Sequence, residues 1–216
     1  MGTIDFKKEL DFLYKASSKN PAFIDVPEFN FLMVDGMGAP NGSKIFQEKV
    51  NILYNVSWTI KMLPKKKIIP EGWFNYVVPP LESLWWTDNE RFDVNKKAGW
   101  KWTLMMMQPE FVTTELVSQV IKDMQELKPE RNYLQVRLEN FHEGIAIQMM
   151  HIGPYELISL TMDKMEAFMK EKEFIFNGKH HEIYFSDPRR TMPEKLKTLV
   201  RIPVKSEKLK TKSEKI

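Results

Sequence analysis

Long apolar stripes with helical spacing alternate along this chain with short β-prone runs, and this alternation restricts the possible folds strongly. The spacing predicts helices over residues 43–63, 113–127 and 154–172. Ser43 is a good N-cap for the first helix, Pro64 follows its end, and Pro154 opens the third at a position that tolerates proline. Helices that alternate with short strands favour an α+β fold.

Strands are predicted at residues 29–34, 73–78, 84–87, 100–107, 133–138, 145–151, 180–185 and 197–204, with 133–138 and 145–151 as a hairpin. The two halves of the chain resemble each other, since WTLMMMQP parallels KTLVRIPV and PLESLWW parallels HHEIYFS. We therefore expect two pseudo-duplicated β-α-β-β modules, about 29–128 and 129–204, with an antiparallel sheet and two long helices around a central groove. Residues 1–28 form a lead-in segment, and 205–216 form a flexible basic tail.

Charge argues against a nucleic-acid partner. The 216 residues include 32 Lys and Arg against 29 Asp and Glu, a formal net charge of +3. The tail alone holds five lysines and two glutamates, which account for this excess. The remaining body is formally neutral and lacks the basic footprint of a phosphate-backbone binder, so no direct nucleic-acid binding is expected.

Missing residue types and motifs exclude several further classes. Without cysteine there can be no disulfide, thiolate metal site or cysteine nucleophile. The charged N-terminus and the lack of a long apolar run favour a cytoplasmic protein without a membrane span. Gly36-Met37-Gly38 is typical of a tight turn rather than a phosphate loop, and no G-x-S-x-G nucleophile motif occurs.

The histidines do not favour a metal site. His151, His180, His181 and Glu182 are the candidate ligands, but adjacent residues of a strand point to opposite faces. His180 and His181 therefore cannot both bind one ion from the same face, and we expect no metal.

Tryptophans and glutamates form the strongest constellation. Trp100 and Trp102 are two residues apart and share one face of a strand, and one of Trp85 and Trp86 can join them. Aromatic walls around a carboxylate suit a flat lipophilic or cationic ligand. A single tryptophan could equally fill a core. For the Met-rich segments, core filling is the commoner explanation and an adaptable binding wall the alternative. The predicted ligand-binding residues are Glu82, Trp85, Trp86, Trp100, Trp102, Met150 and His151.

Five segments are informative in combination: FLMVDGMGAP, VVPPLESLWW, WKWTLMMMQP, EGIAIQMMHIGPYE and HHEIYFSDPRRTMPEKLKTLVRIPV. Together they resemble the GyrI-like small-molecule-binding family over about residues 29–204. The resemblance implies duplicated β-α-β-β modules around a ligand groove. Related domains in transcription activators sense cationic lipophilic drugs through a groove glutamate, which corresponds to Glu182 here. Some stand-alone members hydrolyse cyclopropane-bearing, DNA-alkylating compounds and so detoxify them.

This resemblance leads to a hypothesis about chemistry. A cofactor-independent hydrolase would need a base or water-positioning carboxylate, for which Glu182 is the candidate, and a hydroxyl donor, for which Tyr155 and Tyr184 are the candidates. Two alternatives remain open. The protein could bind multiple drugs without turnover, or it could be an interaction protein of gyrase-inhibitor type with DNA gyrase as its partner.

Overall fold

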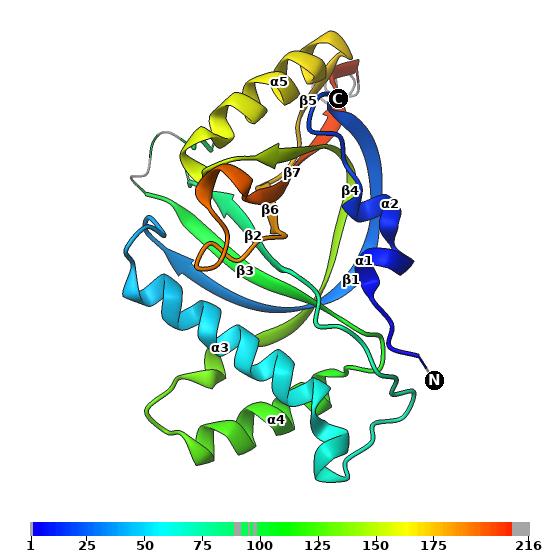
Figure 1. Ribbon diagram of the computed structural model, residues 1–216, viewed down its shortest axis with the longest axis vertical. Helices are drawn as coiled ribbons and strands as arrows, with labels where there is room; N and C mark the ends of the chain where they lie inside the picture. The colour runs from blue at the N-terminus through cyan, green and yellow to red at the C-terminus, as the bar shows by residue number, and fades with distance from the viewer. Residues whose placement is uncertain (1, 89–91, 95, 97–98, 209–216) are drawn as a thin grey trace, which may run out of the picture.

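One antiparallel sheet organises the chain within residues 2–88, 92–94, 96 and 99–208, which are those that the computed structural model describes. The strand order is β4-β1-β3-β2-β6-β7-β5, and β4 also pairs with β7, so that the sheet closes on itself (Figure 1). The strands are β1 (Ala22–Met37), β2 (Leu81–Trp86), β3 (Lys101–Gln108), β4 (Arg137–Ile152), β5 (Phe174–Phe176), β6 (His180–Tyr184) and β7 (Lys197–Ser206).

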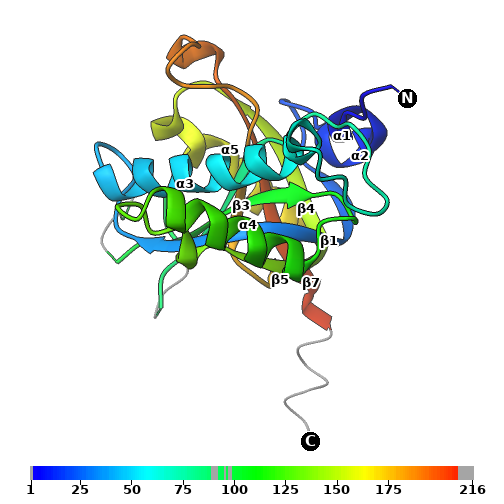
Figure 2. The same ribbon diagram turned by 90° about the horizontal axis from the view of Figure 1, so that it is seen from below.

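The three long helices cover the outer face of this closed sheet. The long helices are α3 (Lys44–Lys61), α4 (Thr114–Leu127) and α5 (Ile158–Glu171). In Figures 1 and 2, α3 and α4 lie together along one side and α5 lies against another part of the sheet. Two short helices, α1 (Phe6–Glu9) and α2 (Asp11–Tyr14), precede the first strand. The arrangement confirms the predicted α+β fold with an antiparallel sheet.

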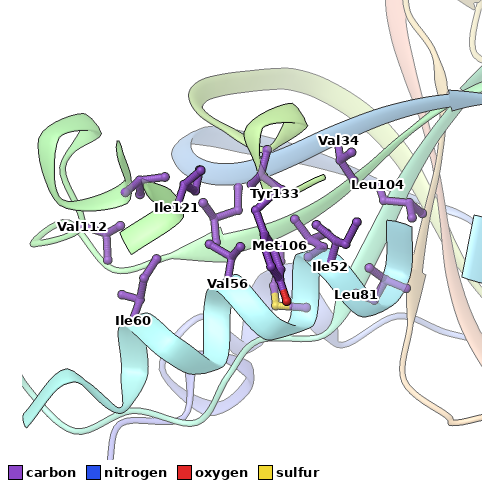
Figure 3. Close-up of a cluster of buried hydrophobic side chains, with 14 of the residues drawn as sticks. Val34, Ile52, Val56, Ile60, Leu81, Leu104, Met106, Val112, Ile121 and Tyr133 are labelled. Carbon is purple, nitrogen blue, oxygen red and sulfur yellow. The ribbon is translucent and has the colours of Figure 1, made fainter. Parts of the chain in front are cut away.

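Helix α3 shows how the local sequence produces this packing. The Ser43 hydroxyl accepts a hydrogen bond from the Phe46 N–H at 3.2 Å and caps the helix. Ile52, Val56 and Ile60 are fully buried. Figure 3 shows them facing residues of the sheet and of α4. Burial of one such side chain contributes about 2 kcal/mol, so tertiary packing stabilises the helix.

The two faces of the sheet bury different clusters. Met106 packs on the outer face with α3 and α4, whereas Met105 and Met107 pack on the inner face with Leu13 and Tyr14 of α2. A third cluster joins β4 and β7 to the buried methionines of α5. Core filling therefore accounts for the Met-rich segments of β3.

The predicted hairpin at residues 133–151 is wrong. Tyr133–Gln135 is a 3-10 turn, and β4 continues as one strand through Gly144. Gly144 has a φ of 71°, yet the strand stays paired with β1 on both sides of it. Residues 73–78 also differ from expectation, since the structure assigns them only an isolated bridge between Tyr76 and Ile4.

The parallel that the sequence suggested between Glu82 and Glu182 does not place them together. β2 and β6 are antiparallel neighbours in which Ser83 lies opposite Glu182 and Glu82 lies opposite Ile183. Because side chains alternate along a strand, Glu82 points to the inner face and Glu182 to the outer face.

The ends of the paired region extend beyond the predicted domain limits. β1 already begins at Ala22, inside the segment predicted as a lead-in, and β7 continues to Ser206, two residues into the predicted tail. Residues 209–216 lie outside the described residues. Among the described helices, none combines the length and the apolar character needed to span a bilayer.

Candidate functional site

A groove of about 540 Å³ opens on the outer face of β2 and β6. It lies between α3 and the start of α5, and the loop at residues 185–189 borders it. Sites for drug-sized ligands commonly occupy roughly 300–1,000 Å³, so the groove is large enough for a small molecule. The predicted residues that line it are Trp85, Trp100, Tyr155, Glu182 and Tyr184.

Glu182 is a buried carboxylate in the lining of this groove. Its Oε1 accepts a hydrogen bond from His180 Nε2 at 2.8 Å, and its Oε2 accepts one from the Tyr184 hydroxyl at 2.7 Å. These three residues alternate along β6 and therefore share its outer face. Glu182 is only 7% exposed, so the two donors hold a buried carboxylate in a defined orientation.

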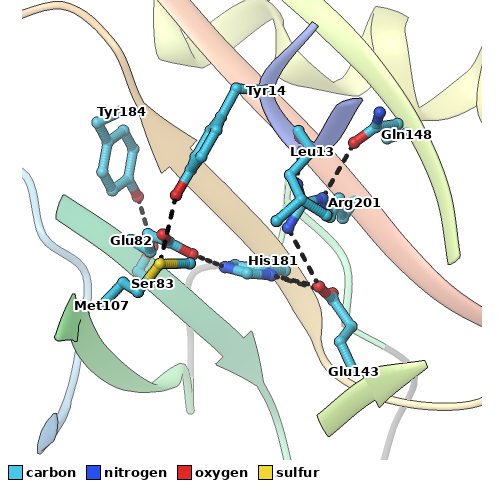
Figure 4. Close-up of polar contacts among 10 residues, drawn as sticks. All are labelled: Leu13, Tyr14, Glu82, Ser83, Met107, Glu143, Gln148, His181, Tyr184 and Arg201. Atoms are coloured by element: carbon cyan, nitrogen blue, oxygen red, sulfur yellow. Dashed lines mark hydrogen bonds and ion pairs between the residues drawn. The ribbon is translucent and has the colours of Figure 1, made fainter. Parts of the chain in front are cut away.

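Tyr184 has no proton left for a ligand. Its single hydroxyl proton is donated to Glu182, so the contact of 2.6 Å with Ser83 is a hydrogen bond that Ser83 donates (Figure 4). Burial and the negative charge of Glu182 raise the pKa of Tyr184 well above its usual range. Tyr184 therefore remains a neutral donor that orients the carboxylate.

Tyr155 is the tyrosine with a free hydroxyl. Its ring stands edge-on to Tyr184, with centroids 5.9 Å apart and planes at 89°. Its hydroxyl forms no hydrogen bond with another side chain or backbone group in the described part of the chain. Burial and the charge of Glu182 raise the pKa of Tyr155 to about 12, which keeps its proton available for donation near neutral pH.

Two of the predicted tryptophans line the groove, and a third lies beneath them. Trp85 and Trp100 line the groove and pack edge-to-face, with their ring centroids 5.3 Å apart. The Trp100 indole N–H is buried and has no acceptor among the described residues. Trp102 lies beneath them, fully buried. Its indole N–H donates a hydrogen bond to the Gly38 carbonyl at 3.0 Å, and its ring centroid lies 4.9 Å from that of Phe46. Trp102 therefore fixes the wall without lining the groove.

Three other predicted ligand-binding residues lie elsewhere. Trp86 packs against the inner-face cluster, with Lys179 Nζ 3.5 Å from a ring centroid. Met150 belongs to the same cluster. His151 uses both ring nitrogens internally, one at 2.9 Å from the Thr161 hydroxyl and the other at 3.0 Å from the Pro154 carbonyl.

Glu82 belongs to a buried charge network on the inner face (Figure 4). His181 lies between two carboxylates, with Nε2 at 2.9 Å from Glu82 and Nδ1 at 3.0 Å from Glu143, and Arg201 Nη1 lies 3.5 Å from Glu143. Burial alone would lower the pKa of His181, but Glu143 and Glu82 outweigh it and raise that pKa to about 9. Burial opposes ionisation of Glu143, yet His181 and Arg201 hold its pKa below the usual range. The network thus places two cations against two acids.

Sequence reasoning missed the helical wall and one histidine. Phe46, Val50, Tyr54 and Trp58 of α3 all line the groove. They are spaced four residues apart, and this stripe is the signal that could have found them. His180 was considered only as a metal ligand, although the pattern His180-x-Glu182 already places both side chains on one face of a strand. Within the described residues, no group of three His, Asp or Glu side chains is arranged to hold a metal ion.

The chain belongs to the GyrI-like small-molecule-binding domain family, whose model matches residues 19–205. It is similar to the structure of an uncharacterised conserved protein from Listeria innocua, at 41% identity and a TM-score of 0.87, over 94% of this chain and 100% of that one. A hydrolase from Listeria innocua is similar at 40% identity and a TM-score of 0.84, with the same coverage.

The fold also resembles the C-terminal domain of EcmrR, at 11% identity and a TM-score of 0.55, over 87% of this chain and 98% of that domain. This likeness concerns the fold alone. No significant match was found among curated proteins.

Proposed function

We propose that the groove binds flat, largely apolar small molecules and that Glu182 directs water onto an activated cyclopropane ring, which detoxifies DNA-alkylating compounds. The observation that carries this proposal is a buried carboxylate with both oxygens fixed, at the side of a 540 Å³ groove with aromatic walls. The Listeria innocua hydrolase, at 40% identity, supports a hydrolytic reaction.

The proposed reaction adds one water molecule to a cyclopropane that is conjugated to a dienone. The water oxygen bonds to the least hindered ring carbon while Glu182 accepts a water proton. The bond between that carbon and the dienone ring breaks, and its electron pair moves through the dienone to the carbonyl oxygen. The resulting phenolate takes up a proton and becomes a phenol, so the substrate itself supplies the electron sink.

Tyr155 and Tyr184 take different roles in this scheme. Tyr155 donates its free hydroxyl to the carbonyl oxygen, where negative charge develops in the transition state. Tyr184 orients Glu182 and is itself held by Ser83. Trp85 and Trp100, which line the groove, hold the flat ring system between their aromatic faces.

Turnover tests the proposal. A spirocyclopropyl dienone is incubated with a hundredfold lower concentration of protein, and the water adduct is quantified by liquid chromatography. Many equivalents of adduct per protein are expected. Glu182→Gln keeps the size of the side chain but removes the base, so it should reduce turnover at least a hundredfold while ligand binding persists. Adduct that stops at one equivalent, or an undiminished rate in the variant, contradicts the proposal.

A second candidate function is sequestration of lipophilic cations without turnover. The observation that favours it is that Glu182 and several aromatic side chains line the same groove, because a carboxylate and ring faces together attract cationic ligands. Equilibrium dialysis with a flat organic cation and with its neutral analogue tests it. Tighter binding of the cation, lost in Glu182→Gln, is expected for this function, and equal binding of both contradicts it.

A further inference from the structure

The segment from Ile4 to Ser17, here called the N-terminal strap, precedes the region that the family model matches. Backbone hydrogen bonds attach both of its ends to the domain. Ile4 donates to Asn75 at 2.9 Å and accepts from Val77 at 2.8 Å, and the Ser17 carbonyl accepts from the Met150 N–H at 2.9 Å. The strap therefore has a defined path across the domain.

Apolar side chains of the strap are buried in that domain. Leu13 is 1% exposed and Tyr14 is 5% exposed, both in the inner-face cluster. The Phe6 ring lies 6.3 Å from both Phe74 and Tyr76, in an aromatic cluster. Burial of this kind makes the strap part of the folded domain rather than an appended tail.

The buried charge network also holds the strap. Arg201 donates through Nη2 to the Leu13 carbonyl, through Nε to Gln148 at 3.0 Å and through Nη1 to Glu143 (Figure 4). Glu143 in turn pairs with His181, which directly precedes Glu182 in β6. β6 thus carries the groove carboxylate on one face and, on the other, a histidine whose partner Glu143 also pairs with Arg201, the residue that holds the strap.

From this anchored position the strap reaches the groove. Lys7 of α1 is one of the residues that line the groove. The Tyr14 ring packs edge-on against Phe185, which also lines the groove, with ring centroids 6.0 Å apart. The Lys7 side chain is exposed and has no ion pair within the described part of the chain. The other lining cation, Arg189, is paired with Asp187 at 2.9 Å. Lys7 is therefore the cation of the lining that remains available to a ligand.

We propose that the N-terminal strap is a fixed wall of the ligand groove and that Lys7 is a specificity-determining residue, which selects flat aromatic ligands bearing an anionic or strongly hydrogen-bond-accepting oxygen group at this end. The inference rests on the small-molecule binding of the proposed function and does not depend on turnover. It adds to the groove a second recognition element, of opposite charge to Glu182.

Two matched probes test this inference in the full-length protein. Pyrene sulfonate and pyrenemethylammonium share one flat ring system but carry opposite charges, and their binding is followed by pyrene fluorescence at 0.15 M salt. Lys7→Glu reverses the charge at the groove. Lys8→Glu makes the same change at an exposed neighbour in α1 that does not line the groove, and it is the matched control.

Opposite shifts for the two probes are expected. Lys7→Glu should weaken binding of the sulfonate and strengthen binding of the ammonium, each by about three- to tenfold, because charges within roughly a Debye length of about 8 Å still interact. Lys8→Glu should change either affinity by less than about twofold, because solvent screens a charge outside the groove. A purely structural effect of Lys7 would shift both probes in the same direction.

The outcomes separate the two proposals. If the wild-type protein binds a probe but Lys7→Glu and Lys8→Glu behave alike, or if Lys7→Glu shifts both probes in one direction, the role of Lys7 is refuted and small-molecule binding stands. If the wild-type protein binds neither probe, the proposed small-molecule function is contradicted and the role of Lys7 with it.

Discussion

Raising the pH from 6 to 9 is expected to destabilise this protein, because the buried His181 loses its proton over that range. The neighbouring Glu143 and Glu82 hold the pKa of His181 at about 9 in the folded state, whereas an unfolded histidine titrates near 6.5. Below pH 6.5 both states are protonated and the full stabilisation is present. Between 6.5 and 9 the folded state binds more protons than the unfolded state, so stability falls as the pH rises.

The magnitude follows from the difference between the two pKa values. A difference of about 2.5 units at about 1.4 kcal/mol per unit corresponds to about 3 kcal/mol between pH 6 and 9. Domains are commonly stable by about 5–15 kcal/mol, so this loss is easily measured. Burial raises the pKa of Tyr184 and Tyr155 above that of an unfolded tyrosine, which adds a further loss near pH 10. Measurements therefore stop at pH 9.

Urea unfolding at half-unit steps of pH provides the assay. The control is His142→Gln, a substitution of an exposed histidine. It should leave the dependence of the unfolding free energy on pH unchanged. Glu82→Gln removes one of the two carboxylates that offset the burial of His181, so it should reduce the loss of stability to less than half, below about 1.5 kcal/mol. A wild-type stability that is constant or rises between pH 6.5 and 9 refutes the assignment of a doubly paired, protonated His181. The assignment is also refuted if the Glu82→Gln variant loses as much unfolding free energy between pH 6.5 and 9 as the wild-type protein.

Three further substitutions test the groove wall and the division of roles between the tyrosines. Gly36→Ala places a Cβ 2.1 Å from the buried Trp102 ring and should lower the free energy of unfolding in urea by about 3 kcal/mol. Gly2→Ala is the control and should be neutral, because no atom lies within 4 Å of its added Cβ. Equal stabilities of the two variants contradict the packing argument. Tyr155→Phe should lower kcat about a hundredfold with little change in KM, because it removes a donor to developing charge. Tyr184→Phe should instead lower kcat only about tenfold, because it removes one hydrogen bond that orients Glu182 but no donor to the substrate. Equal losses of kcat in the two variants contradict the separate roles.

Helices were predictable because their signals are local. Ser43 and Thr113 cap α3 and α4 as their sequence positions indicate, and the apolar stripes face the sheet. The alternation of side chains along a strand is also local, and it predicted that Trp100, Trp102 and one of Trp85 and Trp86 share a face; the structure shows that this one is Trp85. These features depend on neighbours within a few residues, which a sequence displays directly.

Strand pairing was not predictable to the same degree, because register depends on distant partners. A hairpin turn was predicted between residues 138 and 145, but pairing with β1 on both sides of Gly144 keeps β4 continuous. Glu82 was expected in the groove, whereas antiparallel pairing of β2 with β6 turns it to the inner face, where His181 neutralises it. A register shift of one residue exchanges the two faces, so only the three-dimensional pairing separates Glu82 from Glu182.

The central claim is that Glu182 directs water onto a strained ring in the groove. Mass spectrometry of multiple-turnover reactions in water labelled with heavy oxygen tests it most directly. The account predicts a product that carries one heavy oxygen at the opened ring carbon, formed in many equivalents by the wild-type protein and reduced at least a hundredfold in Glu182→Gln. Heavy-oxygen product no faster than without protein, or a protein mass increased by one substrate as the main outcome, would contradict it.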